Sequence, residues 1–165
     1  MLSAVRGAYD VLPDYISNQV TAIDVVDVSV TRGLTAKSGA IQIGCNENET
    51  AYYDSSAFAM CEHVVIHEIS HNTETIKVKC PDGTTCDVIE AFVAAAETDS
   101  GSPILFNSDG TVNEALSNTS LYKINSPRTL SEFYAEYQSQ YVLNPTLLQS
   151  THPDIYQMFY DMYHQ

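Results

Sequence analysis

The segment CEHVVIHEISHNTE, residues 61–74, contains the side chains best suited to chemistry. His67 and His71 are four residues apart, so on an α-helix both imidazoles share one face and can bind one metal ion. Zinc binds imidazole nitrogen at about 2.0–2.1 Å in tetrahedral geometry. Glu68 lies about 100° around the helix from His67, where a carboxylate can take a proton from a zinc-activated water. The pattern predicts zinc-dependent hydrolysis.

The residues around this pattern predict a buried helix. Val64, Val65, Ile66 and Ile69 are apolar, and unpaired histidines and a glutamate would be costly to bury beside them. This favours metal ligands over a solvated helix that happens to contain histidines. His63 lies one further turn upstream and is rotated by about 40°, so we expect a buried or rim histidine there rather than a ligand.

Two histidines and a water leave one coordination position for a protein ligand. The long pattern HExxHxxGxxH is excluded, because Glu74 and Lys77 occupy the positions of its glycine and third histidine. Glu97 has a thermolysin-like spacing from His71. Glu132 and Glu136 are the stronger candidates, because their spacing of four places both carboxylates on one helical face.

HEISH is followed about 60 residues later by EFYAEY, residues 132–137, and then by a proline-containing turn and a terminal aromatic helix. This order resembles the protease domain of anthrax lethal factor and the Pro-Pro endopeptidases. The resemblance implies a zincin-like metallopeptidase fold with one Zn²⁺ per chain. It also implies the residue roles: zinc ligands His67, His71 and Glu132, general base Glu68, and supporting carboxylate Glu136.

The chain departs from this family at the residue expected to stabilise the oxyanion. The family has a tyrosine seven residues before the ligating glutamate, and Asn125 stands there in this chain. Tyr122, ten residues before Glu132, is the predicted catalytic equivalent, with Tyr134 as the alternative. Ser70 replaces the family's common glycine before the second histidine.

Composition narrows the classes of partner. The 165 residues include 21 acidic and 7 basic side chains, for a formal net charge of -14. Such a charge repels phosphate backbones and anionic membrane surfaces, which argues against nucleic acid or membrane as a partner. No run of 18 apolar residues occurs, and the length fits a single domain over residues 1–165.

The four cysteines indicate an exported protein. Cys80 and Cys86 bracket a loop rich in turn residues, CPDGTTC, which predicts a local disulfide. Cys45 and Cys61 would form a second bridge, or Cys61, on the predicted zinc helix, would be a small buried apolar residue. An even count without a zinc-type CxxC spacing favours secretion, with any leader already removed.

Periodicity and breakers predict an α+β fold, with an N-terminal helix and a small twisted sheet before a mainly helical C-terminal half. We expect a helix at 3–18 interrupted near Pro13, a strand within 20–33 ended by Gly33, and an edge strand at 38–44. The expected later helices are 55–72 (capped by Ser55 or Ser56), 87–98 (capped by Asp87), 129–142 and 152–165.

These features predict a secreted, monomeric zinc endopeptidase whose peptide or protein substrate extends the sheet along residues 38–44. Three alternatives remain open. The first is a thermolysin-like peptidase that uses Glu97 as third ligand. The second is a catalytically inactive zincin acting as a binding or toxin-associated module, and the third is an acidic structural domain without metal.

Overall fold

The computed structural model describes residues 2–26, 32–35, 39–44, 50–53, 56–80, 82–101, 105–113 and 129–164. The chain begins with two helices, α1 (Leu2–Asp10) and α2 (Asp14–Ser17). Pro13 stands between them with φ −60° and ψ 148°. Because proline disfavours a helical conformation in the residue before it, the predicted interruption is confirmed.

The N-terminal sheet has three strands, β1 (Ala22–Val26), β2 (Arg32–Thr35) and β3 (Ala40–Gly44). Their order is β1-β3-β2, with β3 parallel to β1 and antiparallel to β2. The prediction that residues 38–44 form an edge strand was therefore wrong, and a substrate cannot pair with β3. The alternation of buried Ile41 and Ile43 with exposed Gln42 reports one buried face, which a central strand has as well as an edge strand.

Two further sequence predictions fail near strand ends. Gly33 lies inside β2, opposite Ile43, and does not end a strand. Ser56 begins strand β5 (Ser56–Ala59) rather than capping a helix, because residues 56–59 pair antiparallel with β4 (Thr50–Tyr53). Ser55 lies outside the described residues.

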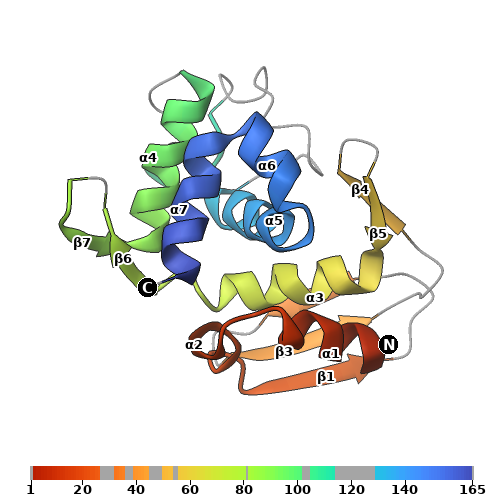
Figure 1. Ribbon diagram of the computed structural model, residues 1–165. Helices are drawn as coiled ribbons and strands as arrows, with labels where there is room; N and C mark the ends of the chain where they lie inside the picture. The colour runs from red at the N-terminus through yellow and green to blue at the C-terminus, as the bar shows by residue number, and fades with distance from the viewer. Residues whose placement is uncertain are drawn as a thin grey trace.

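Helix α3 (Met60–His71) occupies the middle of the molecule. It lies between α1 with the N-terminal sheet on one side and the C-terminal helices on the other (Figure 1). Val65, Ile66 and Ile69 are almost fully buried, which confirms a core helix. Because α3 is packed on both sides, the polar side chains that it also carries must find partners inside the protein.

A disulfide-closed hairpin and helix α4 follow α3. Strands β6 (Lys77–Lys79) and β7 (Thr85–Asp87) pair antiparallel, and Cys80 is bonded to Cys86 as predicted. Helix α4 (Val88–Ser100) begins after Asp87, whose backbone N–H donates to Oε2 of Glu90 at 3.3 Å, and this confirms the predicted cap.

Cys61 is a free, buried cysteine. The prediction that Cys61 forms a bridge with Cys45 was therefore wrong. Cys45 itself lies outside the described residues. A position in the interior of the core helix explains Cys61 as a small apolar side chain.

The C-terminal part is helical, with α5 (Leu130–Leu143), α6 (Pro145–Thr151) and α7 (Pro153–Tyr163). Thr129 caps α5 by accepting from the backbone N–H of Glu132 at 3.3 Å. Helix α6 was not predicted. Rings of Phe92, Tyr134 and Phe159 lie 5.6–6.1 Å apart and join α4, α5 and α7 into one aromatic core. Mixed helices and small sheets confirm the α+β class.

Within the described ranges, no helix is both long enough and apolar enough to cross a membrane.

Replacing both Cys80 and Cys86 with serine should lower the free energy of unfolding by about 2 kcal/mol, because the bridge closes only a short loop in the unfolded chain. Urea titration of the double variant and of the oxidised wild-type protein measures this difference. Alkylation before reduction provides the control: Cys80 and Cys86 should not react, and free thiols at these two positions would contradict the assignment.

Candidate metal centre

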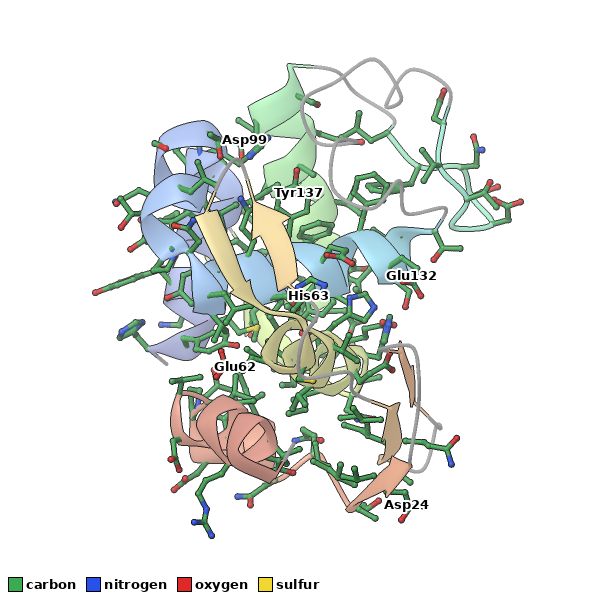
Figure 2. The ribbon with its side chains drawn as sticks, turned by 90° about the vertical axis from the view of Figure 1, so that its right-hand side faces the viewer. Asp24, Glu62, His63, Asp99, Glu132 and Tyr137 are labelled. Carbon is green, nitrogen blue, oxygen red and sulfur yellow. A yellow bond between two sulfur atoms is a disulfide. The ribbon has the colours of Figure 1, made fainter. Side chains whose placement is uncertain are left out.

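A row of histidines on α3 faces a row of glutamates on α5, where the two helices pack together. His63, His67 and His71 recur every four residues on α3, and Glu132 and Glu136 do so on α5. A spacing of four keeps each row on one helical face. His63 and Glu132 mark the two rows in Figure 2, where Glu132 lies at one end of α5. The predicted ligands on the two helices are thus brought together although more than 60 positions separate them in the chain.

His67, His71 and Glu132 place three ligand atoms around one point. Nε2 of His67 lies 3.2 Å from Nε2 of His71 and 3.3 Å from Oε2 of Glu132. Nε2 of His71 lies 3.6 Å from Oε1 of Glu132. A tetrahedral ion with bonds of 2.0–2.1 Å requires ligand atoms about 3.3–3.4 Å apart. The three observed separations therefore fit a small cation at their centre.

The outer nitrogens of the two imidazoles both face carboxylates. Nδ1 of His71 lies 2.9 Å from Oε1 of Glu74. Nδ1 of His67 lies 3.3 Å from Oε1 of Glu136, an electrostatic contact whose N–H direction is not aligned well enough for a full hydrogen bond. An ionised carboxylate only accepts, so the proton of a neutral His71 belongs on Nδ1, which lies closer to a carboxylate than its Nε2 does. Nε2 of His71 then directs a lone pair at the centre, and Nε2 of His67 would do so once an ion replaced the proton that it shares with Glu132.

The electrostatics favour a positive charge at this position. Burial lowers the pKa of His67, but interactions with Glu132 and Glu136 outweigh it and raise the pKa to about 10. The contact with His67 lowers the pKa of Glu132. Burial raises the pKa of Glu136, but His63 and His67 together hold it well below its ordinary value. A proton or a metal ion can supply the charge that these carboxylates require.

A second group of side chains, formed by His63, His67 and Glu136, could also hold a cation. Nε2 of His63 lies 3.4 Å from Oε2 of Glu136, and both residues are about 95% buried. By contrast, the side chain of Glu132 is 48% exposed. Reactive metal sites keep one position open whereas structural sites are closed. The group of His67, His71 and Glu132 is therefore the better candidate for chemistry. His63 contacts Glu136 and stabilises its ionised form.

The other predicted site residues have mixed outcomes. Glu68 is buried on α3 beside His67, with 6% of its surface exposed. Tyr122 lies outside the described residues. Tyr134 is fully buried, and its hydroxyl lies 2.6 Å from Oγ1 of Thr73, so it is a core residue and not a substitute for Tyr122. Glu97 belongs to neither group of described side chains that could hold a metal ion.

Sequence reasoning missed two residues that contact His71. Glu74 was considered only as evidence against a longer motif, and Ser131 was not considered. Oγ of Ser131 lies 2.9 Å from Nδ1 of His71 and donates to Oε1 of Glu74. The available signals were a carboxylate three residues after His71 and a hydroxyl directly before Glu132.

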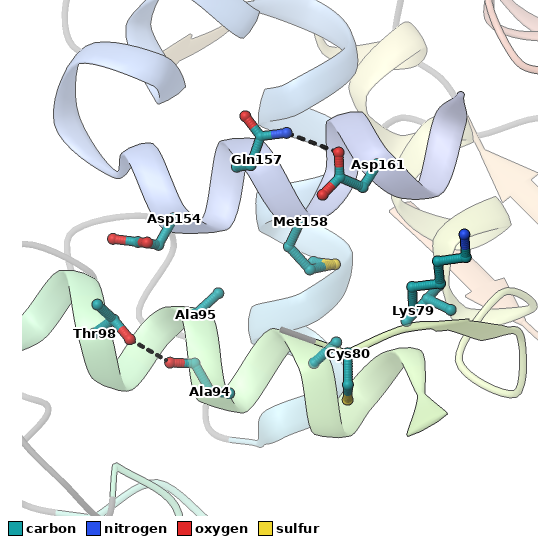
Figure 3. Close-up of a pocket in the computed structure, with 11 residues that line it drawn as sticks. Lys79, Cys80, Ala94, Ala95, Thr98, Asp154, Gln157, Met158 and Asp161 are labelled. Carbon is teal, nitrogen blue, oxygen red and sulfur yellow. Dashed lines mark hydrogen bonds between the residues drawn. The ribbon is translucent and has the colours of Figure 1, made fainter. Parts of the chain in front are cut away.

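A groove of about 460 Å³ lies between α4 and α7, away from these ligands (Figure 3). Ala94 and Thr98 line its α4 wall, and Asp154, Met158 and Asp161 line its α7 wall. None of its lining side chains is a histidine or glutamate. The groove therefore contributes nothing to the metal centre.

No protein-family model matches the chain, and comparisons with curated proteins and with solved structures found no match. The resemblance to lethal factor and the Pro-Pro endopeptidases stays a hypothesis.

Metal uptake at neutral pH should release a proton. With a pKa of about 10, His67 is protonated in the metal-free protein at pH 7, and an incoming ion must displace that proton. The association constant should therefore rise about tenfold per pH unit between pH 7 and 8.5. Calorimetric titration in buffers of different ionisation enthalpy measures the released proton directly. An affinity that does not change over this range would contradict the charge assignment.

Three glutamate variants separate the possible ligand sets. Glu132→Ala should remove most of the metal affinity, because it takes away a bond and a negative charge. Glu136→Ala should weaken binding by about 10–100-fold, as expected for a group that orients a ligand. Glu97→Ala is the control and should change the affinity by no more than a factor of a few. Titration of the purified variants with Zn²⁺ tests this order, and loss of binding in Glu97→Ala alone would favour the thermolysin-like alternative.

Proposed function

We propose that this protein is a zinc-dependent endopeptidase of the zincin type. The observation that carries the proposal is the convergence of His67, His71 and Glu132 on one point, with Glu68 adjacent to the first ligand on the same helix. Two imidazoles and one carboxylate, with a fourth position open, form a ligand set typical of catalytic zinc. The two nitrogen ligands also argue against magnesium and calcium, which prefer oxygen.

A bound zinc ion supplies a Lewis acid that polarises a substrate carbonyl and activates water. The protein's own residues supply the remaining steps. We assign to Glu68 the removal of a proton from the attacking water and its delivery to the leaving amine. Its buried position favours proton transfer in a confined site over exchange with bulk solvent. Tyr122 is assigned to the developing oxyanion on the family resemblance alone.

The substrate is proposed to be an extended peptide bound beside β2. Because β3 is central, β2 is the outer strand on one side of the described sheet, and it packs against α3. A peptide that paired with the outer edge of β2 in the described sheet would gain backbone hydrogen bonds next to the helix that carries His67 and Glu68. This assignment replaces the earlier expectation that β3 binds the substrate.

We further propose that the enzyme is secreted and monomeric and acts on peptides or proteins. The disulfide between Cys80 and Cys86 suits an oxidising compartment. The net charge of -14 would attract basic peptides and repel nucleic acid.

Glu68→Gln should retain the metal and lose about 10²–10⁴-fold in peptide hydrolysis, because the amide keeps the shape but cannot accept a proton. Hydrolysis of a mixed peptide library, followed by mass spectrometry, measures the loss and also reports the cleavage motif. Glu62→Gln on the same helix is the matched control and should remain active.

The same peptide-library assay, applied to the wild-type protein, tests the inactive-module alternative. If wild-type protein binds zinc but cleaves no peptide in the library, the chain is a metal-binding module rather than a peptidase. If Glu68→Gln retains more than a few per cent of the activity, the proposed mechanism is wrong.

A further inference from the structure

The turn that follows α3, residues 72–75, comes directly after the second histidine of the motif and lies against α5, the helix that carries the proposed third ligand. Thr73 and Glu74 in this turn both contact side chains of α5. The turn is therefore held against α5 at two consecutive residues whose side chains make different contacts. Neither Thr73 nor Glu74 belongs to the predicted ligand set.

Thr73 anchors the turn in the protein interior. Its side chain is completely buried, and its hydroxyl lies 2.6 Å from the hydroxyl of Tyr134 and 2.9 Å from Oε1 of Gln138. The same hydroxyl lies 2.7 Å from the carbonyl oxygen of Ser70, at the end of α3. A buried hydroxyl with three polar neighbours resists displacement, because moving it would leave those groups unsatisfied.

Glu74 directs its carboxylate at the metal centre. Oε1 of Glu74 lies 2.9 Å from Nδ1 of His71 and accepts a hydrogen bond from Ser131. Because the serine proton goes to Glu74, the serine oxygen is free to accept from Nδ1 of His71, 2.9 Å away. His71 therefore donates from Nδ1 to two oxygens, and its Nε2 is left to bind a cation.

We propose that Thr73, Glu74 and Ser131 form a brace that fixes the ring of His71 in its metal-binding orientation. The brace rests on the proposed metal centre, and its three members are positioning residues. Ser131 directly precedes Glu132, so one hydrogen-bond network joins the turn after the second ligand to the helix end that bears the third.

The two histidine ligands are held in different environments. Glu136, which faces His67, has a side chain that is 6% exposed, whereas the side chain of Glu74 is 27% exposed. His67 is thus held by the interior, and His71 is held at the edge of the site. Loss of the Glu74 and Ser131 contacts should therefore affect the release of the ion more than the fold.

The same geometry excludes a serine nucleophile activated by His71. In a catalytic triad the serine and the carboxylate contact opposite nitrogens of the imidazole. Here Ser131 and Glu74 both contact Nδ1.

Cobalt(II) bound to the full chain provides the test, because its visible spectrum reports ligand geometry and its transfer to a chelator reports the dissociation rate. Glu74→Ala should release cobalt about 10–100-fold faster than wild type and change the spectrum. Glu74→Gln keeps an acceptor oxygen and should give an intermediate rate. Ser131→Ala should also accelerate release. The double variant Glu74→Ala/Ser131→Ala should accelerate it by less than the product of the two single effects, because both residues act through one network.

The anchor is tested by a second pair of variants. Thr73→Val keeps the shape and removes the hydroxyl, so it should accelerate release, whereas Thr73→Ser should restore a rate near that of wild type. Glu62→Gln is the control, since Glu62 lies on the α1 side of α3 in Figure 2 and near Gly7. It should leave both the rate and the spectrum unchanged.

The results separate the brace from the metal centre. If wild-type protein takes up no cobalt, the metal centre is wrong and the brace fails with it. If wild type binds cobalt and His71→Ala does not, but Glu74→Ala and Thr73→Val release it at the wild-type rate with an unchanged spectrum, the metal centre stands and the brace is refuted. Independent, multiplicative effects of Glu74→Ala and Ser131→Ala would also overturn the shared network.

Discussion

The contact between α3 and α5 brings together three atoms that can accept a proton or a metal ion and that repel one another when neither is present. Nε2 of His67, Nε2 of His71 and a carboxylate oxygen of Glu132 converge within 3.2–3.6 Å. A proton or a small cation placed between these atoms would offset the repulsion among their lone pairs. Because an ion that binds only the folded chain stabilises it, metal occupancy and the packing of these two helices should be linked.

The two histidines of this group are each contacted by a carboxylate, one from the interior and one from the turn after α3. Glu136 holds His67 from the interior, with His63 on its other oxygen, and Glu74 holds His71 from the turn after α3. Each carboxylate orients the imidazole that it contacts, whereas Glu132 remains partly exposed to solvent. The N-terminal sheet and the aromatic core support α3 and α5, so the fold contributes mainly by fixing the distance between the two helices.

Local patterns predicted the parts of the site that lie within one helix. The spacing of His67 and His71 depends only on helical geometry, and so does the shared face of Glu132 and Glu136. The pairing of these two helices is a tertiary event, and only the resemblance to a known family selected Glu132 as the third ligand. The contacts of Glu74 depend on how the turn meets α5, which periodicity does not report.

The errors in the fold have the same cause. Alternating burial identified residues 38–44 as a strand but could not reveal that β1 and β2 lie on both sides of it. Gly33 indicated a break because glycine has a low strand propensity, yet pairing with Ile43 keeps it inside β2. Ser56 offered a suitable helix cap, but pairing between β4 and β5 determined its conformation. In all three cases strand pairing, which the pattern within one segment does not report, determined the structure.

Anomalous diffraction at the zinc absorption edge, from crystals grown with Zn²⁺, tests the central claim most directly. We predict one anomalous peak per chain, about 2.0–2.1 Å from Nε2 of His67, Nε2 of His71 and a carboxylate oxygen of Glu132. The absence of a peak, or a single peak among His63, His67 and Glu136 instead, would contradict the account.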